Sequence, residues 1–162
     1  GFPCNKAPRF ITQLNEKKNG LAFTNSPYMY PTGYDTPVEG IDRVFDDISQ
    51  ETGVCANFPD SGPLIFGYHF KSAVQVVQWG VDEDPRPRTA VLEAHECDPT
   101  CDFFGETGWK AVAEAMPGPR RPEDRGKWLV REPGFYRAYR VKLGGASLNF
   151  DRECLYELFL LQ

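Results

Sequence analysis

The sequence is poor in the residue patterns that mark common enzyme sites. It contains two histidines, His69 and His95. It has no Gly-x-Ser-x-Gly, no glycine-rich phosphate loop followed by Lys and Ser or Thr, and no His-Glu-x-x-His. These absences argue against the commonest serine hydrolase, nucleotide-binding and zinc peptidase sites. We therefore predict no catalytic residues, no metal and no cofactor.

Long apolar runs, excess positive charge and glycosylation signals are also missing. No apolar stretch approaches the ~20 residues of a transmembrane helix, which argues against a membrane span. The formal net charge is −5, whereas general nucleic-acid binding needs a basic surface. No Asn-x-Ser/Thr sequence occurs. The start, Gly-Phe-Pro-Cys, is typical of a processed terminus.

The composition that is present suits a folded domain. Of the 162 residues, 41% are hydrophobic and 14% aromatic, whereas disordered chains have few aromatics and a large net charge. This length allows one domain with a substantial core. We expect residues 1–162 to form a single secreted globular domain and a monomer.

Cysteine usage indicates the compartment. The five cysteines are spread over the whole chain, and all are candidates for disulfides: Cys4, Cys55, Cys97, Cys101 and Cys154. Such scatter favours bridges that stabilise a secreted, extracellular protein over reduced structural thiols. The odd number leaves one thiol over, and the pairing stays open.

Hydrophobic periodicity predicts an α+β fold. Helices are expected over residues 9–18, 38–52 and 107–116, where apolar residues recur at helical spacing. Strands are expected over residues 63–80, 89–96, 135–143 and 152–161, which are β-prone. Alternation within residues 135–143 puts one group on a shared face, namely Phe135, Tyr139, Val141 and Leu143, and puts Arg140 and Lys142 on the other. Residues 21–36 are expected to form a loop. The prediction is an antiparallel sheet of about four strands flanked by helices and long loops, stabilised by disulfides.

Two segments are candidate partner-binding surfaces. Residues 117–133 are rich in Pro, Gly and Arg, and a long loop of this kind is often functional. Its candidate contacts are Arg120, Arg121 and Arg125. The loop of residues 21–36 carries Tyr28, Tyr30 and Tyr34, which either form a contact surface or cover the edge of the core.

The two histidines support an alternative, a secreted hydrolase acting on RNA or a glycan. If their strands pair, His69 and His95 could lie on one sheet face and act as acid and base. The other interpretation is two partly buried strand histidines bonded to their surroundings. His95 could also join Cys97 and Cys101 in a zinc site, but a second close Cys/His pair is missing and bridges suit these cysteines better.

The aromatic and arginine-rich segment Gly-Phe-Tyr-Arg-Ala-Tyr-Arg at residues 134–140, followed by Cys154 near the end, carries a family resemblance. Together with the layout, it resembles the structurally related secreted fungal avirulence effectors of Leptosphaeria and the tomato leaf-mould fungus. The resemblance implies an extracellular, apoplastic virulence protein recognised by a host protein or immune receptor of a plant, without enzymatic activity. The fifth cysteine departs from an even disulfide framework.

A second segment, Pro-Val-Glu-Gly-Ile-Asp-Arg-Val-Phe at residues 37–45, is similar to a strand of secreted fungal ribonucleases of the T1 type. Those enzymes use a Glu, an Arg and two His, and here only Arg43 matches in place. The Tyr-Pro-His segment is absent. The resemblance therefore adds Arg43 to the hydrolase alternative and implies nothing further.

Overall fold

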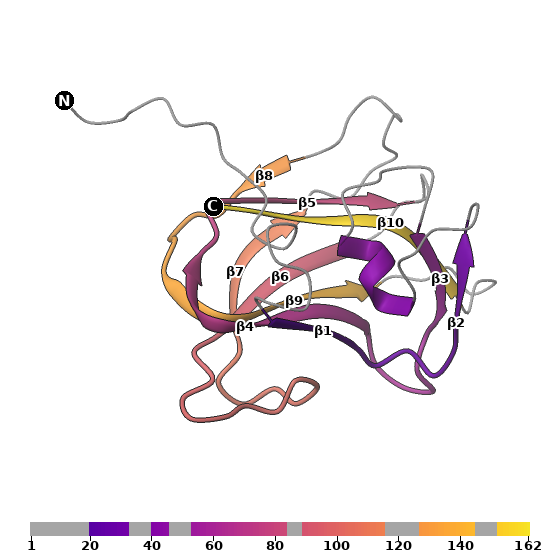
Figure 1. Cartoon of the computed structure of the whole chain (residues 1–162), viewed down its shortest axis with the longest axis horizontal. Helices are drawn as coiled ribbons and strands as arrows, with labels where there is room; N and C mark the ends of the chain where they lie inside the picture. Colours follow the sequence, from indigo (N-terminus) through magenta and orange to yellow (C-terminus); the bar gives the residue numbers. More distant parts are fainter. Residues whose placement is uncertain (1–19, 33–39, 46–52, 84–88, 116–126, 145–151) are drawn as a thin grey trace.

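The protein is a sandwich of two antiparallel β-sheets, as its computed structural model shows (Figure 1). The structure describes residues 20–32, 40–45, 53–83, 89–115, 127–144 and 152–162. The first sheet has the order β1 (Gly20–Thr24), β4 (Leu64–Gln75), β9 (Phe135–Gly144), β6 (Thr89–His95) and β7 (Lys110–Ala115). The second has the order β2 (Met29–Thr32), β3 (Gly53–Asn57), β10 (Arg152–Leu161), β5 (Gln78–Glu83) and β8 (Lys127–Leu129).

The predicted α+β class is wrong. The described residues contain no α-helix, and their one helical turn is the 3-10 helix η1 (Gly40–Phe45), which falls inside the helix expected over residues 38–52. The helix expected over residues 107–116 is strand β7 instead. A bulge in the β6–β7 pairing lets both Val112 and Ala113 face the core, which mimics helical spacing. The helix expected over residues 9–18 lies outside the described residues.

All four segments that were predicted as strands do contain strands. Residues 89–96, 135–143 and 152–161 correspond to β6, β9 and β10, and residues 63–80 contain β4 and β5. The turn between β4 and β5 carries the chain from the first sheet to the second. The expected loop of residues 21–36 contains β2 and nearly all of β1, so the number of strands was underestimated.

The core lies between the two sheets and is filled by alternate residues of the central strands. From the first sheet come Phe66, Leu92 and Tyr139, and from the second come Trp79 and Leu158, all of them buried. Because neighbouring residues of a strand point to opposite faces, the residues between these ones lie on the outer face of each sheet. The outer face of the first sheet therefore holds side chains that the core does not use.

Two disulfides are present among the described cysteines. Cys55 and Cys154 face each other across β3 and β10 and are bridged within the second sheet. Cys97 and Cys101 close a short loop directly after β6. The predicted disulfide stabilisation is confirmed, while Cys4 lies outside the described residues. Within the described ranges, no helix is long and apolar enough to cross a bilayer.

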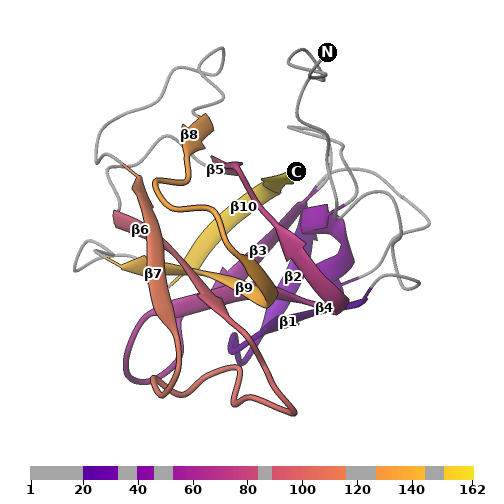
Figure 2. The same ribbon diagram turned by 90° about the vertical axis from the view of Figure 1, so that its left-hand side faces the viewer.

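The described loops lie at both ends of the sandwich and beneath the first sheet. The β1–β2 loop (residues 25–28) and the β3–β4 loop (residues 58–63) lie at one end, which we call the tyrosine end. The β4–β5 turn and the start of β9 lie at the opposite end, where Leu161 closes β10. The β6–β7 loop (residues 96–109) extends beneath the first sheet, away from the second sheet (Figures 1 and 2).

Candidate functional site

Tyr28 is a large aromatic side chain that stands in solvent at the tyrosine end. It is 60% exposed and comes from the β1–β2 loop. Its ring centroid lies 6.1 Å from that of Tyr30, at a tilt of 39°. Tyr30, on β2, is partly buried. The pair therefore places an exposed ring beside a partly buried one.

The backbone around Tyr28 is held by hydrogen bonds to the strands beside it. The Tyr28 carbonyl accepts from the Asn57 backbone N–H at 2.9 Å. The Ser26 hydroxyl lies 2.8 Å from the Tyr28 carbonyl and 2.9 Å from the Asn57 carbonyl, so it can donate to either. These contacts fix the loop to the end of β3. The exposed ring is thus presented on an ordered support, which lowers the entropy cost of binding a ligand.

Asn25 attaches the same loop to the first sheet. Its side-chain oxygen accepts from the Ile65 backbone N–H at 2.8 Å, and its side-chain nitrogen donates to the Pro63 carbonyl at 3.0 Å. Its own backbone N–H donates to the Ile65 carbonyl at 3.4 Å. The β1–β2 and β3–β4 loops are therefore joined, and Asn25 and Ser26 are the residues that join them.

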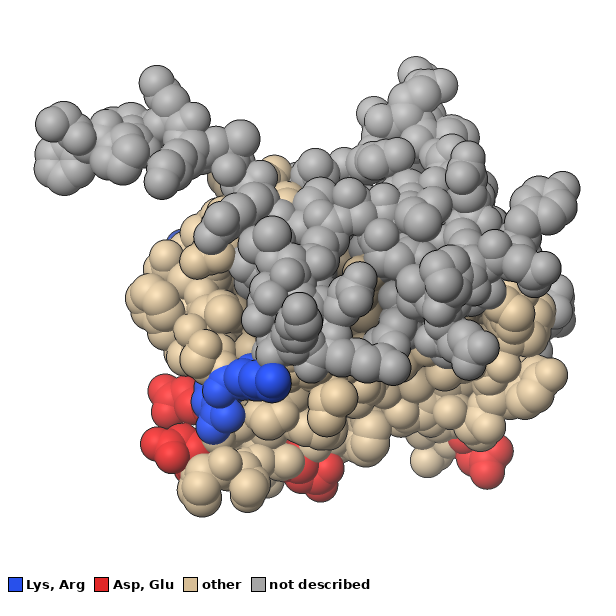
Figure 3. All heavy atoms as spheres, viewed as in Figure 1, with Lys and Arg blue, Asp and Glu red and all other residues tan. Residues whose placement is uncertain are grey.

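The described part of the face in Figure 3 carries few charges. Most of it is neither acidic nor basic, with a few acidic groups along the lower edge and basic atoms gathered at the left. Asp60, on the β3–β4 loop, is the exposed acid of the tyrosine end among the described residues of its two loops. The described residues of these two loops therefore carry one acidic and no basic side chain.

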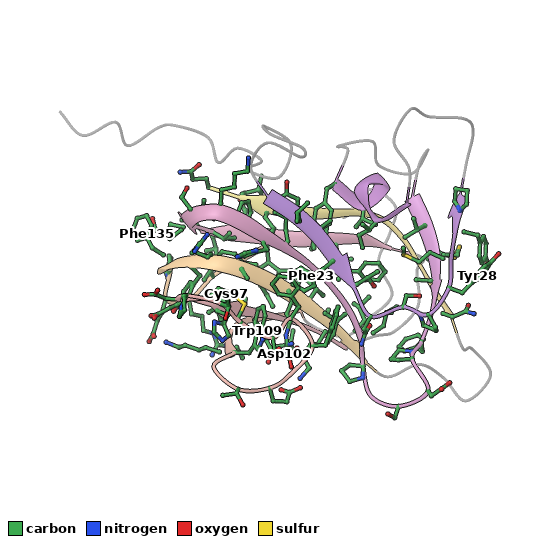
Figure 4. The ribbon with its side chains drawn as sticks, turned by 60° about the horizontal axis from the view of Figure 1, so that its bottom comes forward. Phe23, Tyr28, Cys97, Asp102, Trp109 and Phe135 are labelled. Atoms are coloured by element: carbon green, nitrogen blue, oxygen red, sulfur yellow. A yellow bond between two sulfur atoms is a disulfide. The ribbon has the colours of Figure 1, made fainter. Side chains whose placement is uncertain are left out.

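A second group of side chains covers the outer face of the first sheet. We call it the outer-face cluster: Phe23, Glu93, Phe103, Trp109 and Arg140. The Phe23 and Phe103 rings are stacked, 4.2 Å apart at 8°. A Cβ at Gly67 would collide with the Phe23 ring, so glycine is required there for the ring to lie on the strand. Figure 4 shows the labelled Phe23, Trp109 and Cys97 close together beneath the sheet.

Arg140 is the centre of the outer-face cluster. Its guanidinium is fully buried and its Nε donates to Glu93 Oε1 at 2.8 Å. Its Nη1 donates to the Phe103 carbonyl at 2.7 Å, and its Cζ lies 4.1 Å from the centre of the Trp109 ring. These contacts pair the charge of Arg140 with Glu93 and cover one face of the Trp109 ring. The cluster therefore holds the β6–β7 loop against the sheet and offers less open surface than Tyr28.

The hydrolase alternative fails on the positions of the histidines. His69 and His95 are both aligned with Ala138, on either side of β9, so they share the outer face of the first sheet. Two strands apart, their backbones are roughly 10 Å from each other, given ~4.8 Å between strands. The His69 ring packs on Phe103 and the His95 ring on Trp109, so each imidazole lies against the β6–β7 loop.

His95 is also fully bonded within its loop. Its Nδ1 accepts from the Cys97 backbone N–H at 2.7 Å, and its Nε2 lies 3.2 Å from the Thr107 carbonyl. Both nitrogens are therefore occupied by the backbone, as expected of a structural histidine. Arg43 belongs to η1, and nothing is described of its side chain.

The other predicted contact residues fall mostly outside the described chain. Arg120, Arg121, Arg125 and Tyr34 lie there, so their roles stay predictions. Tyr28 and Tyr30 are described and do lie together at the surface. Sequence reasoning missed the contacts of Trp109 and Glu93 with Arg140, because it placed Trp109 inside an expected helix. It did assign Arg140 and Lys142 to the face opposite Tyr139, and this alternation is confirmed.

Sequence comparisons find no match, whereas structural comparison finds solved structures with a similar fold. No protein-family model matches the sequence, and no curated protein matches it. Among solved structures, the chain is similar to the family 32 carbohydrate-binding module from C. perfringens NanJ in complex with galactose. The TM-score is 0.60 at 12% identity, covering 96% of this chain and 100% of that one.

Two further neighbours have the same architecture. One is a pectin-binding carbohydrate-binding module, with a TM-score of 0.54, 11% identity, and 85% and 91% of the two chains covered. The other is chitosan-binding module 1 of a chitosanase/glucanase from Paenibacillus sp. IK-5, with a TM-score of 0.57, 15% identity, and 88% and 94% covered. At these identities the likeness establishes the fold.

These neighbours correct the predicted function and partners. The effector hypothesis depended on an α+β layout, and the fold is instead the β-sandwich of carbohydrate-binding modules. An effector-type protein acting on plant host proteins or immune receptors is therefore the wrong prediction. The ribonuclease-like hydrolase is wrong as well, because the histidines do not form a site. The effector-family resemblance itself stays an untested prediction.

Proposed function

We propose that this protein binds carbohydrate at the tyrosine end, with the Tyr28 ring as the principal contact. The observation that carries the proposal is an exposed tyrosine held on an ordered loop, in a sandwich whose structural neighbours are carbohydrate-binding modules. Loops presented by a rigid scaffold are common places for binding residues.

The chemistry of an aromatic ring suits a sugar. One face of many pyranose rings carries only C–H bonds, and these are weakly positive. The face of a tyrosine ring is electronegative and apolar, so the two surfaces pack together and release water. The phenol hydroxyl and nearby polar groups such as Asp60 can exchange hydrogen bonds with sugar hydroxyls. The single charged side chain among the described residues of the two loops, Asp60, favours a neutral glycan over a highly charged one.

The first prediction concerns Tyr28→Ala. Removing the ring removes the surface on which the sugar packs, so the affinity should fall at least about tenfold, or ~1.4 kcal/mol. The measurement is affinity electrophoresis through gels containing galactan, pectin or chitosan, followed by calorimetry with the best ligand. A glycan array supplies a broader panel for the wild-type protein.

Phe135→Ala is the matched control. Phe135 is 67% exposed and lies at the opposite end of the sandwich from Tyr28 (Figure 4). The Phe135→Ala substitution should leave glycan binding unchanged, because it removes a similar exposed ring from the end opposite Tyr28. Absence of binding to every glycan by the wild type, or equal losses in the two variants, would contradict the proposal.

We also propose that the protein works outside the cell. Two disulfides among the described cysteines are compatible with an oxidising compartment, where such bonds persist. Binding to extracellular glycans requires the same location. Fractionating the native source and probing with an antibody would test this, since a reduced cytosolic pool would contradict it.

A further inference from the structure

One group of metal-ligating side chains has no role in the proposed glycan site. His95, Cys97 and Cys101 each offer a ligand atom, and these atoms all lie within 4.8 Å of one another. The two sulfurs are joined as a disulfide. The group lies where β6 ends and the β6–β7 loop begins, on a different element from Tyr28.

The contacts of His95 already select one ring nitrogen as a ligand. Nε2 lies 3.2 Å from the Thr107 carbonyl, which can accept a hydrogen bond and cannot donate one. The proton therefore belongs on Nε2, and Nδ1 carries the lone pair. Nδ1 faces Cys97, whose backbone N–H it accepts at 2.7 Å. In metal sites, a backbone carbonyl commonly holds the non-ligating nitrogen of a histidine in this way.

The loop fits closely around this arrangement. Gly108 has a φ of 81°, and a Cβ there would collide with His95 Nε2. Glycine is therefore needed both for the backbone conformation and for the approach of the loop to the imidazole. The Trp109 ring packs on the other side of His95, with centroids 5.2 Å apart. The imidazole is thus held in place before any ion binds.

We propose that His95, Cys97 and Cys101 form a redox-gated zinc site, closed to metal while the disulfide exists and opened by its reduction. A thiol or phosphine reductant donates two electrons, the Cys97–Cys101 sulfur bond breaks, and two thiols form. Zn²⁺ then displaces both thiol protons and is bound by two thiolates and His95 Nδ1. Solvent supplies the fourth ligand of the tetrahedral ion.

Binding requires two local rearrangements, because Nδ1 must exchange the Cys97 backbone N–H for the ion and the two sulfurs must separate. Zinc–sulfur bonds of ~2.3 Å at tetrahedral angles place two thiolates about 3.7 Å apart. Breaking the Cys97–Cys101 bond allows the two sulfurs to reach this separation. Asp98, Pro99 and Thr100 between them are exposed, which lets the short loop adjust. Cys101 and His95 are partly exposed, so an ion can reach them from solvent.

The residue types favour zinc over harder ions. Two thiolates with one imidazole match the sulfur and nitrogen ligands of zinc, whereas calcium and magnesium require oxygen. A metal bound here would replace the disulfide as the clamp on the β6–β7 loop. Reduction would release residues 97–101 only, since Phe103 and Trp109 stay held by Arg140, and zinc would fix that short segment again.

The test uses Co²⁺ as a coloured substitute for Zn²⁺, on the full chain carrying Cys4→Ser. This background removes a thiol outside the described residues. After anaerobic phosphine treatment, thiol counting shows how many bridges have opened, and peptide mapping of the alkylated thiols shows which. We expect one Co²⁺ per chain with thiolate charge-transfer absorption, displaced by Zn²⁺. The untreated protein should bind none.

Three variants locate the ion. His95→Gln should weaken Co²⁺ binding more than about tenfold, because even losing an orienting partner of a ligand costs that much. The Cys97→Ser/Cys101→Ser variant should lose the absorption entirely. Because it retains Cys55 and Cys154, it also tests whether the thiols of that bridge bind Co²⁺. His69→Gln is the matched control, because His69 shares the sheet face but has no cysteine beside it.

Two results would overturn the proposal. Failure of the reduced protein to bind Co²⁺ would show that the three side chains do not form a site. Equal binding by the Cys97→Ser/Cys101→Ser variant would place the ion elsewhere. If circular dichroism shows that His95→Gln does not fold, the serine variant and the comparison of reduced with untreated protein decide the outcome.

Discussion

Arg140 is a fully buried charge on the outer face of a sheet, where strand residues usually meet water. Glu93 provides its counter-charge at 2.8 Å, and Glu93 is itself nearly buried. A buried pair gains little net stability over apolar residues, but removing one partner leaves the other charge uncompensated. Lys142 Nζ, 3.9 Å from Glu93, can compensate in part.

Arg140→Met should therefore destabilise the protein by about 3 kcal/mol. The loss includes the hydrogen bond to the Phe103 carbonyl and the contact with Trp109. Urea unfolding measures the free energy directly. Lys110→Met is the control, because the Lys110–Glu132 pair is 3.9 Å long and well exposed, so its removal should cost less than about 1 kcal/mol. Similar losses in both variants would contradict a special role for Arg140.

His69 should make stability depend on pH. Burial, and then the positive charge of Arg137, lower the pKa of His69 from its usual 6.5. Below that value the unfolded chain takes up a proton that the folded protein does not, so the free energy of unfolding falls as the pH falls. At neutral and higher pH both states are neutral at His69, and this loss disappears.

The prediction is that His69→Gln reduces the loss of stability between about pH 8 and about pH 5. Carboxylates titrate alike in both proteins, so the difference between the two pH profiles isolates His69. Parallel profiles would show that His69 titrates normally in the folded state. Chemical denaturation at several pH values provides the measurement.

At the scale of elements, the two disulfides differ in the length of chain they close. Cys55–Cys154 joins β3 to β10 across a separation of 99 residues, whereas Cys97–Cys101 spans 4. A crosslink restricts the unfolded chain more when its loop is longer. The inter-strand bridge should therefore matter more to the stability of the sandwich.

Replacing Cys55 and Cys154 by Ala should cost about 4.7 kcal/mol, and replacing Cys97 and Cys101 about 2 kcal/mol, on the loop-entropy estimate. Thermal and urea unfolding of the two double variants gives the comparison. A larger loss from the short bridge would mean that the β6–β7 loop contributes more to the fold than the joining of β3 and β10.

At the scale of the whole molecule, the sandwich keeps its two candidate sites apart. Tyr28 lies at one end, and the His95–Cys97–Cys101 group lies beyond the end of β6, towards the opposite end. The core between the sheets includes residues from both, such as Phe66 and Trp79. Because the two candidate sites share no contacts that the structure describes, a change at one should leave ligand binding at the other intact.

The sequence predicted the strands that are long and regular. Alternation in residues 135–143 correctly placed Tyr139 and Arg140 on opposite faces, because side chains of a strand alternate whatever the fold. Apolar, β-branched composition located β4, β6 and β10 for the same local reason. Tyr28 and Tyr30 were also proposed from the sequence alone, as aromatic residues in a loop interrupted by proline.

Tertiary structure decided the rest. Val112 and Ala113 have the spacing of a helix face, and only pairing with β6 and its bulge makes them a strand. His69 and His95 lie on one face, yet the intervening β9 keeps them apart, and no local pattern specifies which strand lies between. The sequence determines which residues prefer extended backbone and which faces they divide into. Strand order and loop packing depend on contacts between segments that are distant in the sequence. Those contacts leave the Tyr28 ring exposed and place Arg140 over the Trp109 ring.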